Sequence, residues 1–128
     1  MVIDSSALIA IILEEPDASI YYAAIANSPV RLLSAAILVE SSLVLLRRRT
    51  ASATAALDSL ISHLKIEIIS VDHRQALLAR EAFQRFGKGR HKAALNFGDC
   101  FSYALAKQTG EPLLFKGTDF SETDITPA

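Results

Sequence analysis

Short apolar runs alternate along the chain with longer segments in which hydrophobic residues recur at helical spacing. Each short run predicts a buried strand, because aliphatic residues fill it and turn or capping residues end it. The predicted strands cover residues 2–3, 30–33, 66–71 and 113–115. The predicted helices cover residues 6–13, 17–27, 35–49, 50–65, 73–86 and 99–109, with a basic loop over 87–97 and a last loop over 116–123.

This alternation predicts one α/β domain over residues 1–128. Strands that are apolar throughout suit a parallel sheet with helices on both faces, which is a three-layer sandwich. In such sheets, ligands bind at the carboxyl ends of the strands, near the point where the strand order reverses. Side chains just past the predicted strands are therefore the first candidates for function.

The composition limits the class of protein and its cellular location. The chain is 51% hydrophobic, enough for one core, and its formal net charge of −1 neither requires nor excludes a nucleic-acid partner. Its single cysteine, Cys100, permits no internal disulfide and suits a reducing cytoplasm. The longest uninterrupted apolar run, 7–13, is too short to span a membrane, and the N-terminus lacks the basic segment of a signal peptide. We expect a cytoplasmic protein without membrane contact.

Four acidic residues fall where a ligand would bind. Asp4 directly follows the first predicted strand, Asp99 opens the last helix, and Asp119 lies four residues past the last strand. Glu40 stands in the otherwise apolar third helix. Taken singly, each has an ordinary explanation as a helix-terminal, exposed helical or turn residue. Independent acids, however, have no reason to gather at the same end of one sheet.

Convergence of these carboxylates would call for a cation, because like charges at close range cannot all stay ionised. Oxygen ligands favour Mg²⁺ or Mn²⁺, and acid clusters that hold such ions commonly serve phosphoryl chemistry. One cysteine and three scattered histidines show no zinc-ligand spacing. No glycine-rich nucleotide-binding motif is present either.

Three segments carry a family resemblance: VIDSSAL at 2–8, NFGDCFSYALA at 96–106 and PLLFKGTDF at 112–120. In this order and spacing they resemble the PIN-domain ribonucleases, and among them the VapC toxins of type II toxin–antitoxin modules. The resemblance runs nearly end to end. It implies a PIN-like three-layer sandwich with a central parallel sheet flanked by helices.

Carried over by position, the resemblance implies an acidic quartet and its neighbours. Asp4 and Asp99 correspond to the direct metal ligands, and Glu40 and Asp119 complete the set. Ser6 matches a small hydroxyl residue beside the metal site. Several relatives have an acid where this chain has Thr118, so the quartet here has no spare, and Asp124 is a weaker alternative for the fourth position.

The resemblance also implies an activity and partners. It predicts a Mg²⁺-dependent endoribonuclease toxin, with Mn²⁺ as an alternative ion, neutralised by a cognate VapB-like antitoxin. The unusually apolar helices favour a homodimer face or an antitoxin groove as well. Two alternatives stay open: a non-catalytic PIN-fold module that binds RNA or protein, and a metal-dependent nuclease or phosphatase outside a toxin–antitoxin system.

Basic residues close to the acids are candidates for contact with RNA phosphates, which would give affinity independent of sequence. Lys88, Arg90 and Lys92 lie in the loop before the last helix, and Lys116 follows the last strand. An ordinary solvated loop explains the first three equally well. The arginine run at 47–49 is better explained by interaction with the helix dipole.

Overall fold

The computed structural model of the chain describes residues 1–48 and 51–128. Its elements in chain order are β1 (Val2–Ile3), α1 (Ser5–Ile12), α2 (Ala18–Asn27), β2 (Leu32–Ser34), α3 (Ala35–Arg47), α4 (Ala51–His63), β3 (Glu67–Ile69), α5 (His73–Phe86), α6 (Phe97–Thr109), β4 (Leu113–Leu114) and the 3₁₀ helix η1 (Asp119–Glu122). Every predicted strand and helix is present, with ends that differ by a few residues. Positions 49 and 50, where one predicted helix ends and the next begins, lie outside the described residues.

The strands of the described chain form one parallel sheet in the order β3-β2-β1-β4. Val2 pairs with Leu32 on one side and with Leu113 on the other, so β1 is central. The chain moves from β1 outward to β2 and β3 and then returns to place β4 on the opposite side of β1. The strand order therefore reverses at β1, and the carboxyl end of β1 is the position that this topology favours for a ligand.

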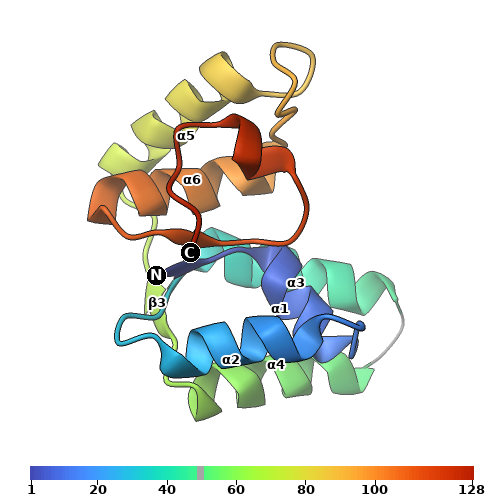
Figure 1. Cartoon of the computed structure of the whole chain (residues 1–128). Helices are drawn as coiled ribbons and strands as arrows, with labels where there is room; N and C mark the ends of the chain where they lie inside the picture. The colour runs from blue at the N-terminus through green and yellow to red at the C-terminus, as the bar shows by residue number, and fades with distance from the viewer. Residues whose placement is uncertain (49–50) are drawn as a thin grey trace.

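Helices cover both faces of the sheet. α5 and α6 lie on one face, while α1, α2 and α4 lie on the other, as Figure 1 shows, and α3 packs against α1 and α4. Side chains alternate accordingly: Val2 and Leu113 join the core beneath α5 and α6, whereas Ile3 and Leu114 join the core formed with α1 to α4. The predicted three-layer α/β sandwich is confirmed. Within the described residues, no helix is long and apolar enough to cross a membrane.

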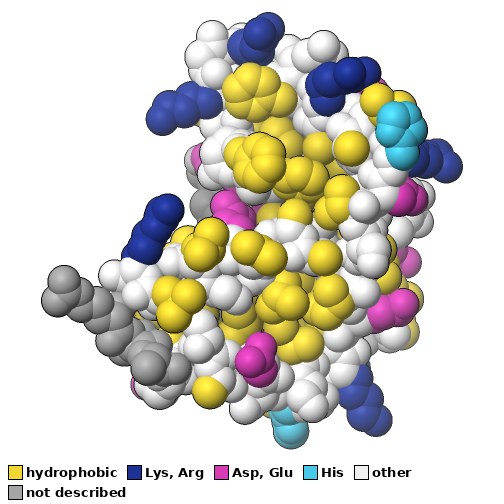
Figure 2. Space-filling model, turned by 180° about the vertical axis from the view of Figure 1, so that it is seen from behind, with side chains coloured by type: hydrophobic (Ala, Val, Ile, Leu, Met, Phe, Trp, Pro, Cys, Tyr) yellow, Lys and Arg dark blue, Asp and Glu magenta, His cyan; other side chains and the backbone are white. Residues whose placement is uncertain are grey.

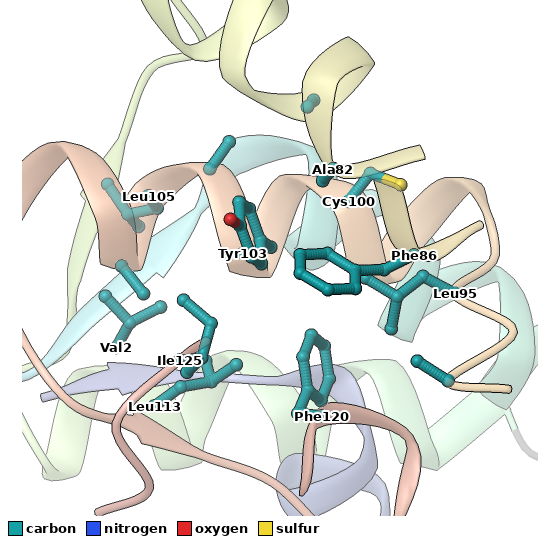
Figure 3. Packing of buried hydrophobic residues seen from close by; sticks show 14 of the residues in the cluster. Val2, Ala82, Phe86, Leu95, Cys100, Tyr103, Leu105, Leu113, Phe120 and Ile125 are labelled. Atoms are coloured by element: carbon teal, nitrogen blue, oxygen red, sulfur yellow. The ribbon is translucent and has the colours of Figure 1, made fainter. Parts of the chain in front are cut away.

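The core beneath α5 and α6 holds α6 firmly against the sheet. Figure 3 shows Val2 and Leu113 of the sheet facing Tyr103 and Leu105 of α6, and all four side chains are buried. The ring of Phe86, at the end of α5, packs on Tyr103 with a centroid separation of 5.8 Å. This packing fixes α6, and with it Asp99, relative to β1.

The C-terminal segment closes the outer side of β4. Leu113 forms a parallel bridge with Pro127, and the backbone N–H of Ala128 donates to the Leu113 carbonyl at 3.0 Å. Phe120 and Ile125 add buried side chains to the core. The edge of the sheet is thereby covered, which removes an unpaired strand edge from solvent.

The last α-helix begins two residues before the predicted start. Asn96 is its N-cap and accepts a hydrogen bond from the Asp99 backbone N–H at 3.0 Å, while the Asp99 carboxylate accepts one from the Asn96 backbone N–H at 2.7 Å. This reciprocal capping box makes Asp99 the third residue of α6. The prediction that Asp99 opens the helix was wrong, because Asn96 had been assigned to the preceding loop. The predicted loop over 116–123 likewise contains η1.

Candidate active site

Asp4 lies at the carboxyl end of β1 and is held there by two serine hydroxyls. It is the N-cap of α1, and its Oδ2 accepts hydrogen bonds from the Ser6 backbone N–H at 2.9 Å and from Ser6 Oγ at 2.6 Å. Its Oδ1 accepts a hydrogen bond from Ser102 Oγ of α6 at 2.6 Å. Asp4 is 2% exposed. The cap and the candidate ligand are thus one carboxylate with a fixed orientation.

Ser6 connects Asp4 to the segment that follows β4. While it donates to Asp4, Ser6 Oγ also accepts a hydrogen bond from the Lys116 backbone N–H at 2.9 Å. Two chain segments that are distant in sequence, the start of α1 and the residues after β4, therefore meet at this hydroxyl. The structure places Ser6 next to Asp4 at the carboxyl end of β1.

Glu40 is directed from α3 toward the start of α6. Its Oε2 is buried and has no hydrogen-bond partner within the described residues, although Ser5 contributes a side-chain hydrogen bond to this carboxyl group. Burial raises the pKa of Glu40; the Ser5 hydrogen bond opposes this rise, and the charge of Asp4 adds to it. Gly98 lies directly beneath the carboxylate, where a Cβ atom would collide with it. Glu40 is therefore an inward-facing member of the site, not an exposed helical residue.

Asp99 is the most strongly perturbed acid of the candidate site. Burial raises its pKa from 3.8 to about 6; the hydrogen bond from the Asn96 backbone opposes this, and the negative charges of Asp4, Glu40 and Asp119 add to it. All three other members of the predicted quartet thus act on Asp99 electrostatically. Repulsion of this kind marks carboxylates that share one region of the protein.

Asp119 completes the group from the solvent side. It is exposed at the start of η1, two residues after Gly117, whose φ of +102° lets the chain turn sharply after β4. Asp124, the alternative for this position, is held elsewhere: it accepts a hydrogen bond from Tyr103 at 2.8 Å and pairs with Arg85 and Lys107. The geometry therefore favours Asp119 as the fourth acid.

The candidate RNA-binding residues differ in how free they are. Lys116 Nζ is bound by Glu15 at 2.6 Å and by Asp17 at 2.7 Å, and these contacts raise its pKa. Lys92 pairs with Glu122. Lys88 and Arg90 are exposed and form no ion pair within residues 1–48 and 51–128, although the Arg90 guanidinium lies 5.9 Å from the Phe83 ring centroid. Lys88 and Arg90 are therefore the more available cations.

The carboxylate oxygens of the candidate site are the donors that a hard divalent cation prefers, but the described residues do not form a complete ligand set. In the described part of the chain, no group of three or more His, Cys, Asp or Glu side chains is arranged so that it could hold a metal ion. Mg²⁺ often binds through one or two carboxylates and keeps several waters, so a donor set as small as two acids would suit its chemistry. The unpartnered Oε2 of Glu40 and the repulsion at Asp99 are what a nearby positive charge would relieve.

An apolar groove adjoins these acids, formed by two hollows that share Phe97 and Phe101. One, of 450 Å³, lies between α5 and α6, and the other, of 260 Å³, lies between α3 and α6. Glu40 and Gly98 line the second hollow, so the site opens onto the groove. Phe97 is 78% exposed. Figure 2 shows hydrophobic side chains gathered in a band over one face, with an acidic side chain within it.

Comparison with known proteins identifies the family of the chain. The PIN domain family matches residues 1–125. The chain belongs to the PIN-domain family. The family accounts for almost the whole length of the chain, so Asp4 and the acids of α3, α6 and η1 all lie within its PIN domain.

Three proteins similar to this chain share the name VapC. A Ribonuclease VapC of Mycolicibacterium smegmatis is 49% identical over 125 residues, which cover 98% of this chain and 97% of the relative. Ribonuclease VapC28 of Mycobacterium tuberculosis is 49% identical over 129 residues, covering 100% and 97%. The crystal structure of VapC20 of Mycobacterium tuberculosis, titled a sarcin–ricin loop cleaving toxin, superposes with a TM-score of 0.81 at 20% identity over 99% and 97% of the two chains. This last likeness supports the fold.

Two residues of the PIN site were missed by sequence reasoning, Ser102 and Gly98. Ser102 is fully buried, and its position three residues after Asp99 could have suggested that both face the sheet. Gly98 stands in the first turn of α6, where a glycine lowers helix stability and so invites a structural reason. The contact with Glu40 supplies that reason.

Proposed function

We propose that this protein is a Mg²⁺- or Mn²⁺-dependent endoribonuclease and the toxin of a type II toxin–antitoxin module. The observation that carries the proposal is the placement of buried acids at the carboxyl edge of the sheet, where Asp4 is held by Ser102 and Glu40 has a buried oxygen with no partner among the described residues. Full-length similarity to VapC ribonucleases supports RNA as the substrate.

In this proposal Asp4 and Asp99 hold the cation. When bound, a divalent ion of this kind offsets negative charge on the scissile phosphate and lowers the pKa of a water molecule. Asp4 is oriented for this task by its hydrogen bonds from Ser6 and Ser102. The capping box with Asn96 restrains Asp99 in the same way.

In this proposal Glu40 and Asp119 bind protons or orient water molecules. Glu40 has a raised pKa and a buried oxygen without a partner in the described part of the chain, so it can hold a proton or accept a hydrogen bond from a water at the edge of the groove. Asp119 is exposed and faces the solvent side of the site, where it can orient a water that approaches the phosphate. Lys88 and Arg90 supply contact with the RNA backbone that weakens as salt rises.

The partners follow from the surface. We propose that the apolar groove is covered in the cell, by a second copy of the chain or by a VapB-like antitoxin, because exposed apolar patches of this kind mark interaction sites. A segment seated there would reach Glu40 at the floor of the second hollow. Neutralisation of the toxin would then couple binding to loss of access to the acids.

A cleavage assay with purified protein tests the catalytic proposal. RNA, single-stranded DNA and a small phosphodiester are incubated with the wild type, Asp4→Asn and the control Asp58→Asn, which alters an exposed acid of α4. We expect cleavage of RNA by the wild type and the control in Mn²⁺ or Mg²⁺, and none with Asp4→Asn or with excess EDTA. Full activity in EDTA would refute the metal requirement, and cleavage of the small ester alone would favour a phosphatase.

A growth assay tests the toxin proposal. Induced expression of the chain should arrest growth, and co-expression of the adjacent reading frame should relieve the arrest. Relief by Asp4→Asn without any antitoxin would tie the toxicity to the same site. Unimpaired growth in the presence of active enzyme would argue for a ribonuclease outside a toxin–antitoxin module.

A further inference from the structure

Ser102 is a buried serine on α6 whose hydroxyl reaches across the core to the first strand. Its side chain is fully buried, and its Oγ lies 2.6 Å from Asp4 Oδ1 in a hydrogen bond between residues 98 positions apart. Such a short hydrogen bond to a carboxylate is charge-assisted and strong. We propose that Ser102 is a positioning residue that fixes the carboxylate of Asp4 in its cation-binding orientation, an inference that rests on the proposed function.

A serine inside a helix ordinarily makes a different bond. Its hydroxyl usually donates to the carbonyl four residues earlier, a bond that lies within the helix and needs no other element. Ser42 does this with Leu38 at 2.8 Å, and Thr109 does it with Leu105 at 2.8 Å. Ser102 instead gives its proton to Asp4. Ser102 therefore bonds to a distant residue in place of the carbonyl four residues earlier, so its hydrogen bond links α6 to the candidate site.

The bond also selects one oxygen of Asp4. A carboxylate oxygen accepts about two hydrogen bonds. Oδ2 already receives the Ser6 N–H and the Ser6 hydroxyl, whereas Oδ1 receives only Ser102 within the described residues. Oδ1 is therefore the atom with a lone pair left for a cation. Ser102 fixes the direction of that lone pair, because it occupies the other one.

The placement of Ser102 connects the two proposed ligands. It lies three residues after Asp99 on α6, so the two side chains share a face of the helix. One helix thus supplies one ligand and the restraint on the other. The position of α6 therefore affects both proposed ligands.

Three serine variants of the full-length protein test the proposal. Ser102→Ala removes the hydroxyl, and Ser102→Thr keeps it. Ser28→Ala is the matched control: Ser28 is also buried and also makes a 2.6 Å hydrogen bond, to the Val30 carbonyl, at the opposite edge of the sheet. The readouts are the Mn²⁺ dissociation constant by calorimetry without RNA, the melting temperature, and the Mn²⁺ concentration that gives half-maximal RNA cleavage.

We expect Ser102→Ala to weaken Mn²⁺ binding by about tenfold or more, which is the usual effect of removing a hydrogen bond to a metal ligand. The Mn²⁺ needed for half-maximal cleavage should rise in parallel while the KM for RNA stays the same. Ser102→Thr should recover most of the affinity, and Ser28→Ala should lower only the melting temperature.

Each other outcome is informative. Unchanged Mn²⁺ affinity in Ser102→Ala, with a lower melting temperature, overturns the positioning role and leaves the proposed ribonuclease intact. If Ser102→Ala fails to fold, Ser102→Thr decides the question. A Mn²⁺ affinity weakened tenfold in Ser102→Thr overturns the positioning role, and a near-normal affinity supports it. Failure of the wild type itself to bind Mn²⁺ overturns the metal dependence in the proposed function and this inference with it.

Discussion

Replacing Asp99 with asparagine should make the metal-free protein more stable while it abolishes cleavage of RNA. The asparagine side chain can still accept the backbone hydrogen bond from Asn96 through its carbonyl oxygen, so the capping box of α6 survives. What the substitution removes is a buried negative charge that Asp4, Glu40 and Asp119 repel. The prediction therefore separates the electrostatic cost of the site from its structure.

The size of the effect follows from the pKa. Asp99 titrates at about 6 in the folded protein, against 3.8 for an unperturbed aspartate. Because the folded state holds its proton more tightly, stability falls as the pH rises from about 4 to about 6 and stays low above that range. A rise of about two pKa units corresponds to about 3 kcal/mol at neutral pH. Removal of the charge should recover up to this amount, or roughly 10 °C in melting temperature for a domain of this size.

Urea unfolding of the wild type and of Asp99→Asn in EDTA, at pH 4 and pH 7, measures this difference. We expect nearly equal stability at pH 4 and a more stable variant at pH 7. Asp72→Asn is the control with the opposite sign, because hydrogen bonds from the Gln75 N–H and the Gln108 side chain lower the pKa of Asp72. Mn²⁺ should reverse the order of wild type and Asp99→Asn at pH 7. An asparagine variant that is less stable at pH 7 in EDTA would refute the reasoning.

Three further substitutions probe the surroundings of the site. Gly98→Ala should reduce RNA cleavage at least tenfold, because its methyl group would collide with the Glu40 carboxylate. For the same reason it should not give the stabilisation of up to about 1 kcal/mol that helix propensity alone predicts. Cleavage rates and unfolding curves measure the two effects, and a more stable, fully active variant would contradict the contact. Asp124→Asn should cleave RNA normally and should lower the free energy of unfolding by about 1 kcal/mol or less at neutral pH. Burial raises the pKa of Asp124, but hydrogen bonds from Tyr103, Lys107 and Arg85 outweigh it and lower the pKa, so the loss should fade as the pH falls below about 4. An inactive variant would return Asp124 to the site. Phe97→Asp should lower the mass of any dimer to that of a monomer in light scattering, and a wild type that is monomeric at high concentration would leave the groove to the antitoxin.

The backbone of the site could be predicted from the sequence because local signals define it. The apolar pair Val2–Ile3 followed by an N-cap residue predicts a strand that ends at Asp4, and the structure confirms it. Asp4 directly follows this strand, so the rule that ligands bind at the carboxyl ends of strands selects it from the sequence, and the structure adds that the strand order reverses at β1. Glu40 stood out because it interrupts an apolar helix, and its carboxylate is partly buried in the structure.

Long-range contacts could not be predicted in the same way. The sequence places Lys116 near the acids, but its ion pairs with Glu15 and Asp17 depend on how the connection between α1 and α2 packs against the segment after β4. The bond from Ser102 to Asp4 and the contact between Gly98 and Glu40 likewise join residues from separate elements. Neither periodicity nor capping patterns carry information on such pairs.

The central claim is that the acids at the carboxyl edge of the sheet form a metal-dependent site for RNA cleavage. The most direct test is a single-turnover cleavage assay with 5′-labelled RNA at pH 7.5, in which Mn²⁺ is titrated from zero for the wild type, Asp4→Asn and the control Asp58→Asn. We expect saturable cleavage at defined positions for the wild type and the control, and none for Asp4→Asn at any Mn²⁺ concentration. Cleavage by Asp4→Asn at the wild-type rate, or by the wild type in EDTA, would contradict it.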